Sequence, residues 1–384
     1  MTAHHDIIIV GAGVAGLRAA QCLVATGRDV ALIDAADRVG GRIATDRHGD
    51  FLVDRGFQLL NPAYPQLAHC VDMRALDLRL AAAAVRIEKP SGSLVWGNPL
   101  SDSRSTRTVL RHLTTGIRAM PQLSQWAFRR PRHDDHRSTA IALGASSLPD
   151  SLRREVMEPF LRGVLLDEHL DTPYSYTQWV LRTLVRAQPG VPAQGMGALP
   201  AAMCERLADA TFYLSTSVED VTATTVHTAQ GTFTAAVVID ARSIATANAT
   251  HRVSTWWFAA PATTDRTVVL DGVGNRLLNA LDLAAVNSNY APRSRGLIAA
   301  SSLRRHDDEL IREDVARLYG LATGDIELVV RHDIEHALPR CTSVPRRASS
   351  VVNGIVTAGD ATATPSIQGA LASGADAARR VLAV

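Results

Sequence analysis

The distribution of apolar and polar positions predicts a strand, a helix and a second strand at the start of the chain. Residues 6–10 (DIIIV) form a short apolar run of the kind found in buried parallel strands. Residues 14–26 have helical spacing and end before Gly27, and residues 30–34 (VALID) form a second apolar run. This order of elements is typical of an α/β fold wound around a parallel sheet.

The pattern changes twice along the rest of the chain. Residues 102–186 are rich in Arg, Leu and Ala with helical spacing, which predicts a mostly helical region. Residues 211–241 alternate with period two and contain many Thr and Val, which favours strands. The later elements are expected as strands at about 266–270, 277–287, 296–301 and 326–331, and helices at about 306–320 and 368–382.

Length, charge and the lengths of apolar runs limit the classes to which the protein can belong. A chain of 384 residues is long for one hydrophobic core, which predicts two domains. A formal net charge of +2 gives no field that would attract nucleic acid. No apolar run reaches about 18 residues, so no transmembrane helix is expected. The N-terminus enters a strand within a few residues, which leaves no room for a signal peptide.

The cysteine and lysine content limits which metal, redox and catalytic sites the chain can form. The four cysteines form no CxxC pair, so neither a zinc site nor a redox dithiol is indicated, and no metal is expected. Scattered thiols fit a reducing cytosol, which predicts a cytoplasmic protein and leaves association with a membrane surface open. Lys89 is the only lysine of the chain, so a nucleophilic or Schiff-base lysine is hardly a candidate.

Three glycines between the first strand and the first helix form a GxGxxG motif: Gly11, Gly13 and Gly16. Gly11 permits the tight turn, Gly13 lets the backbone approach a pyrophosphate, and Gly16 lets the helix pack closely on the strand. Asp34, at the end of the second strand, stands where a carboxylate accepts hydrogen bonds from an adenosine ribose. The motif therefore predicts a bound dinucleotide, and a glycine-rich turn without a ligand is the alternative.

The segment DAADRVGGRIAT (residues 34–45) makes the prediction more specific. Its acid followed by R-x-G-G-R resembles flavoproteins of the amine oxidase, protoporphyrinogen oxidase and phytoene desaturase superfamily. The resemblance implies that this loop lies against the pyrophosphate of FAD, with Arg38 and Arg42 as donors. Gly40 and Gly41 would let the backbone come close to the pyrophosphate. For Arg38, a solvated surface side chain is the alternative.

Two further segments extend the resemblance toward the flavin ring. FLVDRGFQLL (residues 51–60) is similar to the family's segment that leads to the isoalloxazine, which implies that Gly56, Phe57 and Gln58 lie near the ring. An ordinary strand with Phe57 in the core is the alternative. Val218, in STSVEDV, fits the family's strand that contacts adenine.

The C-terminal segment GIVTAGDATATPSIQGALASGADAARRVL completes the resemblance, because the family also ends with a strand, an acidic G-D or G-E turn and a long helix. By this resemblance, Gly359 and Asp360 would contact the ribityl chain. The helix N-terminus would face the flavin pyrimidine and stabilise negative charge on the reduced ring, through Ile367, Gln368 and Ala370.

The expected fold class is α/β, with a Rossmann-type FAD-binding domain interleaved with an α+β substrate domain. The FAD-binding domain is expected at 1–75, 190–245 and 335–384, and the substrate domain at 76–189 and 246–334. The resemblance implies an FAD-dependent oxidoreductase that removes a hydride from a C–N or C–C bond of a mostly apolar small molecule. The alternatives are a flavin-dependent isomerase without net redox change and a nonenzymatic flavin-binding accessory protein.

The sequence lacks a lysine that is common in the family, and no motif in it identifies several further properties. Many flavin amine oxidases hold a lysine, through a water, near the flavin, but residues 253–300 contain no lysine. No catalytic residue can therefore be named. Cys341 lies too far upstream of Gly359 to carry the flavin covalently, so noncovalent FAD is expected. Neither the electron acceptor nor the oligomeric state is encoded in a motif.

Overall fold

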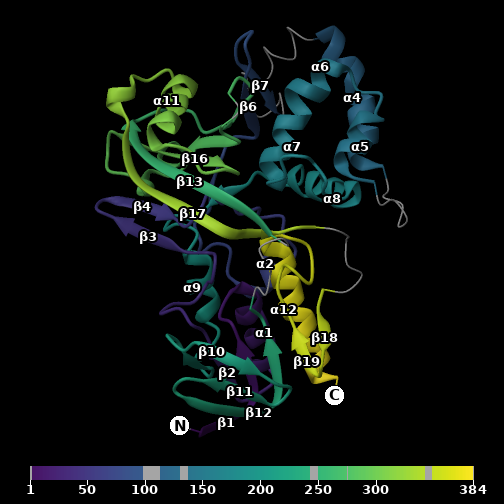
Figure 1. Cartoon of the computed structure of the whole chain (residues 1–384), viewed down its shortest axis with the longest axis vertical. Coiled ribbons are helices and arrows are strands. Elements are labelled where there is room, and N and C mark those ends of the chain that lie inside the picture. The colour runs from purple at the N-terminus through teal and green to yellow at the C-terminus, as the bar shows by residue number, and fades with distance from the viewer. Residues whose placement is uncertain are drawn as a thin grey trace.

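Two large β-sheets, one above the other in Figure 1, organise the protein. The computed structural model describes residues 2–97, 113–129, 137–242, 250–274, 276–341 and 348–383. Both chain ends lie at the level of the lower sheet, which joins strands from the beginning, middle and end of the chain. Within the described ranges, none of the helices combines the length and the apolar character needed to cross a membrane.

The lower sheet has eight strands around a parallel centre. Its strands are β1 (Thr2–Val10), β2 (Val30–Ile33), β9 (Thr211–Tyr213), β10 (Val218–Val221), β11 (Thr225–Thr228), β12 (Gly231–Asp240), β18 (Ser350–Val352) and β19 (Ile355–Thr357). Strand β1 pairs in parallel with β2 and β12, and parallel pairing continues to β9 on one side and β19 on the other. Strands β10 and β11 form an antiparallel extension, which agrees with the period-two pattern predicted there.

The alternation of side chains along β1 explains why its apolar run is buried on both faces. Ile7 and Ile9 lie in the cluster under the helices α1 (Val14–Val24), α9 (Ala198–Cys204) and α12 (Ile367–Leu382). Ile8 and Val10 lie in the cluster on the opposite face, together with Val226 of β11. A strand that is covered on both sides needs apolar residues at every position, as in parallel sheets generally.

The upper sheet has seven strands in the order β17-β13-β16-β15-β14-β6-β7. Its strands are β6 (Ala84–Glu88), β7 (Leu94–Gly97), β13 (Thr250–Pro261), β14 (Val268–Asp271), β15 (Asn279–Asp282), β16 (Arg295–Ser302) and β17 (Glu327–Pro339). Trp256 and Trp257 of β13 are fully buried on opposite faces. The Trp256 face packs against α11 (Asp308–Tyr319), and the Trp257 face packs against the hairpin of β3 (Thr45–His48) and β4 (Phe51–Asp54).

A group of helices stands beside the upper sheet (Figure 1) and confirms the helical prediction for the described part of residues 102–186. Residues 102–112 and 130–136 of that prediction lie outside the described residues. These helices are α4 (Leu113–Phe128), α5 (Thr139–Gly144), α6 (Asp150–Leu152), α7 (Glu158–Leu165) and α8 (Tyr174–Leu184), with a π-helical turn at Arg153–Met157 between α6 and α7. The short helix α2 (Leu67–Cys70) and the two-stranded pair β5 (Arg79–Leu80) and β8 (Gly190–Val191) complete the connections.

Two predicted strands differ from those observed. The strand expected at 277–287 ends at Asp282, because the Asp282 carboxylate accepts hydrogen bonds from the N–H groups of Ala284 (3.0 Å) and Ala285 (3.3 Å) and so starts α10 (Leu283–Val286). The strand expected at 326–331 continues as β17 to Pro339, because it pairs with β13 along most of its length. The predicted α/β class is confirmed by the parallel centre of the lower sheet and by the helices that pack against it.

Candidate functional site

The GxGxxG turn joins β1 to α1, and its three glycines meet three different surroundings. Gly11 has φ +103°, in the region that favours glycine, and its N–H donates to the carbonyl of Ile33 at 2.7 Å. A Cβ at Gly16 would overlap the carbonyl oxygen of Gly11, so only glycine lets the helix lie this close to the turn. A Cβ at Gly13 would meet no heavy atom within 4 Å. The turn is therefore tightly packed except at Gly13, which leaves space where a pyrophosphate would fit.

The N-terminus of α1 adds favourable electrostatics to that space. Gly13 occupies the N-cap position, no side chain caps the helix, and its first turn contains no acidic residue. The first N–H groups of a helix are unpaired and carry partial positive charge. They are thus available to an anion that approaches Gly13.

The R-x-G-G-R loop packs directly on the glycine-rich turn. The Gly40 N–H donates to the carbonyl of Ala12 at 2.9 Å, and Gly40 has φ +106°. A Cβ at Gly41 would lie 3.4 Å from the Cα of Gly13, so the two glycine-rich segments are close neighbours. The loop predicted to follow the pyrophosphate is consequently next to the predicted phosphate-binding turn.

Arg38 is half-buried in this loop and is held only weakly by the carbonyls near it. Its guanidinium donates only long hydrogen bonds of 3.4 Å to the carbonyls of Val39 and Gly41, and it forms no ion pair with any residue that the structure describes. Burial, and then the nearby charge of Arg55, lowers the pKa of Arg38. A guanidinium in such surroundings would be stabilised by a phosphate anion.

Asp34 holds the end of β2 against the same turn. Its Oδ2 accepts a hydrogen bond from the Ala12 N–H at 2.7 Å, and its Oδ1 accepts one from the Ala36 N–H at 2.8 Å. Each carboxylate oxygen keeps a further lone pair, which a ribose hydroxyl could use. The Thr216 N–H donates to the Asp34 carbonyl at 2.8 Å, which brings the start of β10, and with it Val218, to the same end of the sheet.

Arg42 joins segments from opposite ends of the chain. Its guanidinium forms an ion pair with the buried Asp360 at 2.5 Å and donates to the carbonyl of Ala337 at 2.9 Å. The Gln58 side chain donates to the Arg42 carbonyl at 3.1 Å. Three predicted cofactor residues, Arg42, Gln58 and Asp360, thus meet at one place. The Arg42 guanidinium, which was expected to face the pyrophosphate, is paired with Asp360.

The segment at Gly56–Gln58 is not a strand, because β4 ends at Asp54. The alternative of an ordinary strand over this segment is therefore wrong. Phe57 is partly buried against the cluster that contains Trp257. A Cβ at Gly56 would lie 2.7 Å from the Cδ1 of Ile334, so the segment runs close to β17.

The N-terminus of α12 is held by a side-chain cap and by a contact of the Gln368 side chain. Ser366 caps the helix by accepting a hydrogen bond from the Gly369 N–H at 3.0 Å. The Gln368 side-chain oxygen accepts one from the Gln66 N–H at 3.0 Å. Ile367 and Ala370 pack in the core between the lower sheet and the helices α1 and α9. The Gly359 N–H donates to the Ser373 hydroxyl at 2.8 Å, which holds the turn before Asp360 against the helix.

Sequence reasoning missed a buried carboxylate beside these segments, Asp54 at the end of β4. It is fully buried and accepts hydrogen bonds from the Thr45 hydroxyl (2.5 Å), the Met196 N–H (2.9 Å) and the Tyr290 hydroxyl (2.6 Å). Burial raises the pKa of Asp54 to about 6, although these hydrogen bonds oppose the shift. An acid that closes the apolar run FLVD was the only signal for it in the sequence.

The fold and the open turn at Gly13 are those expected of a dinucleotide-binding protein, and comparison identifies the family. The family described as flavin containing amine oxidoreductase matches residues 14–267. The chain belongs to this family, which confirms the resemblance found in the motifs and the prediction of FAD as the cofactor.

Individual relatives agree with this assignment. Putrescine oxidase of Kocuria rosea is 43% identical over 73 residues, which are 19% of this chain and 15% of that protein. The chain matches 15% or less of the length of the curated relatives that it resembles. The structure of putrescine oxidase bound to putrescine has a TM-score of 0.69 at 18% identity and full coverage of both chains (100%). Cyclohexylamine oxidase of Brevibacterium oxydans IH-35A has a TM-score of 0.70 at 15% identity, over 98% of each chain. These structural likenesses establish the fold.

Proposed function

We propose that the protein is an FAD-dependent oxidoreductase that oxidises the C–N bond of a small, mostly apolar amine. The observation that supports this most is the meeting of Arg42, Gln58 and Asp360, because it joins three of the predicted cofactor segments next to the open turn at Gly13. The family description and the two related amine oxidases favour an amine over other substrates.

The residues of the chain would divide the binding of FAD between them. We assign the pyrophosphate to the N-terminus of α1 and Arg38, and the adenosine ribose to Asp34. Gln58 and Asp360 would position the flavin end. The bound flavin supplies the hydride acceptor, while the protein contributes position and electrostatics. The FAD is proposed to be noncovalent.

The apolar character of the substrate is proposed from the cluster beside Gly56–Gln58. Partly buried Phe57 and Leu59 pack there against the fully buried Trp257 of the upper sheet. A charged ammonium group would lose hydration in such surroundings, which favours a neutral amine. A substrate that arrives neutral needs no general base.

Other functions stay open and are distinguished by what happens to the flavin. Desaturation of a C–C bond is the alternative within the same class. An isomerase would form product without consuming an electron acceptor. An accessory protein would bind FAD and leave it oxidised with every substrate.

The division into an FAD-binding domain and a substrate domain is also a proposal. Strand β17 crosses the boundary between them at 334/335. A cytoplasmic location is likewise proposed.

The test is the visible spectrum of the purified protein, followed by anaerobic mixing with substrates. We expect a yellow protein that releases FAD on acid precipitation and bleaches with cyclohexylamine. If only a polyene or a porphyrinogen bleaches the flavin, that class of compound would replace the amine as the proposed substrate. If dithionite reduces the flavin but no substrate does, the accessory role is favoured. A colourless protein that binds NAD would overturn the proposal.

A further inference from the structure

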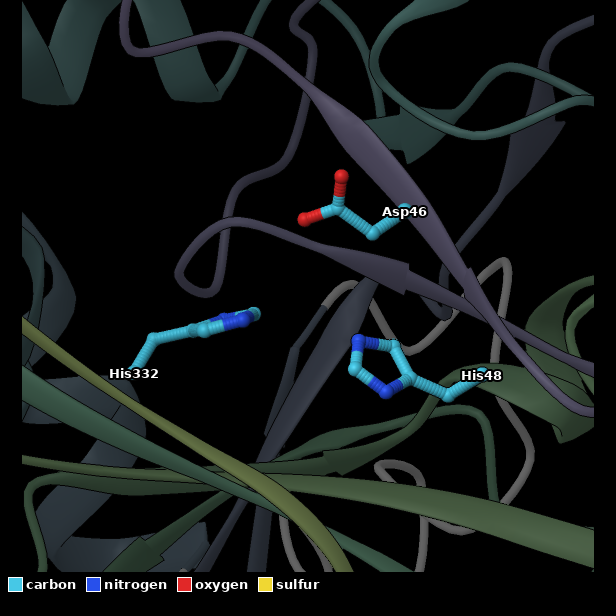
Figure 2. A group of neighbouring side chains, drawn as sticks. All are labelled: Asp46, His48 and His332. Carbon is cyan, nitrogen blue, oxygen red and sulfur yellow. The ribbon is translucent and has the colours of Figure 1, made fainter.

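A cluster of metal-ligating side chains lies where the β3–β4 hairpin approaches the upper sheet. Asp46 and His48 stand two positions apart on β3, so they project from the same face of the strand. His332 reaches them from β17. Figure 2 shows the three side chains turned toward a common space. One ligand atom from each lies within 4.8 Å of the other two.

These three ligands are the kind that a transition metal prefers. Two imidazoles and one carboxylate suit zinc and similar divalent ions, whereas Mg²⁺ and Ca²⁺ prefer oxygen ligands. Ligand atoms around a tetrahedral zinc stand about 3.4 Å apart, given bonds of about 2.1 Å, so small rotations would close the cluster. All three side chains are half-buried, which leaves a fourth position open to water.

One imidazole nitrogen of the cluster is free to bind a cation. Nδ1 of His332 is buried without a hydrogen-bond partner among the described residues. A neutral imidazole and an ionised carboxylate are the forms that coordinate a cation.

Arg55 orients the carboxylate within the cluster. Its Nε donates to Asp46 Oδ2 at 2.6 Å and a terminal nitrogen donates to Oδ1 at 3.1 Å. Each oxygen keeps a second lone pair for a metal, and carboxylates that bind metals are commonly held by such an outer partner. The positive charge of Arg55 opposes the cation, so the two histidines must supply much of the affinity.

We propose that Asp46, His48 and His332 bind one divalent cation of the zinc type. The cysteine pattern had indicated no metal, because it reports only ligands that are close in sequence. A cation here would tie the β3–β4 hairpin to β17. The hairpin leads directly into Gly56–Gln58, so the cation would also steady the segment assigned to the flavin end.

The first test is calorimetric titration of the chelator-treated, flavin-loaded protein with Zn²⁺. We expect one saturable site, with affinity reduced at least tenfold in His48→Ala and in His332→Ala. His69→Ala is the matched control, because His69 is exposed on α2 and lies outside the cluster. Zinc affinity unchanged in both cluster variants, or no saturable binding by the wild type, would overturn the proposal.

Thermal unfolding gives an independent readout that does not use enzyme activity. Zn²⁺ should raise the melting temperature of the wild type and of His69→Ala, and not that of the cluster variants, because a ligand stabilises only the state that binds it. Mg²⁺ at the same concentration should have no effect. Equal melting temperatures of all variants without zinc would show that the substitutions leave the fold intact. Stabilisation of His332→Ala by zinc to the wild-type extent would contradict the site.

Discussion

Gly13 and Gly16 lie in the same turn, yet a side chain would have different effects at the two positions. Gly13→Val should fold normally, since no protein atom lies within 4 Å of the added Cβ, but it should lose FAD because valine fills the phosphate space. Gly16→Ala should lower the free energy of unfolding by about 1–3 kcal/mol or more through overlap with Gly11. Flavin absorbance and circular dichroism melting measure the two effects. A yellow Gly13→Val protein would contradict the assignment of this space.

Asp54 should make stability depend on pH in a defined direction. Its folded pKa of about 6 exceeds the unfolded value of about 4, so its contribution to stability is complete below pH 4 and is lost as the pH rises through 6. Asp54→Asn should therefore reduce the change in unfolding free energy between pH 4 and pH 6 by about 2–3 kcal/mol. Urea unfolding at both pH values tests this. Asp50→Asn, at an exposed acid of the same hairpin, is the control and should behave as wild type.

At the scale of elements, the contact between α1 and α12 depends on Gly374. A Cβ at this position would overlap the carbonyl oxygen of Ala15, so Gly374→Ala must push the helices apart. We expect a loss of about 1–3 kcal/mol in unfolding free energy, together with weaker FAD binding, because the start of α12 belongs to the proposed site. Gly144→Ala, at an exposed helix end with no heavy atom within 4 Å, should be neutral or slightly stabilising. Equal effects of the two substitutions in denaturant titration would rule out this close packing.

For the whole molecule, FAD should link parts of the chain that are distant in sequence. The proposed site combines residues 11–58 with residues 359–370, so FAD binds the folded state and not the unfolded chain. Removal of FAD should lower the melting temperature, and FAD at 100 times its dissociation constant should restore about 2.7 kcal/mol. Differential scanning calorimetry of apoprotein and reconstituted protein measures this. Identical melting curves would show that the cofactor does not join the two regions.

The lysine content predicts a slow reaction of the reduced protein with oxygen. The only lysine, Lys89, forms an ion pair with Glu155 at 2.7 Å beside the upper sheet, and no lysine follows it in the chain. The water-mediated lysine of many flavin amine oxidases therefore has no counterpart in residues 253–300, and arginine would hold a water differently. Stopped-flow mixing of photoreduced protein with aerated buffer should show slow reoxidation. Completion within milliseconds would mean that the lysine is not required.

Contacts of short range could be predicted from the sequence, whereas the partners of particular side chains could not. The apolar runs at 6–10 and 30–34 and the spacing of Gly11, Gly13 and Gly16 express local requirements, namely burial on two faces and a turn without side chains. The strand expected at 277–287 failed for an equally local reason. Apolar periodicity does not reveal that Asp282 caps a helix, because capping depends on where the backbone turns.

The sequence by itself therefore determined the class of fold, the family and the segments expected to hold FAD, since these depend on neighbours within one strand, turn or helix. Only the tertiary structure decided that Arg42 pairs with Asp360, that Asp54 is enclosed by Thr45, Met196 and Tyr290, and that His332 lies beside β3. Each of these contacts depends on how separate elements pack. Hydrophobic periodicity specifies which face of an element is buried, but it does not specify which residue of a distant element will meet it.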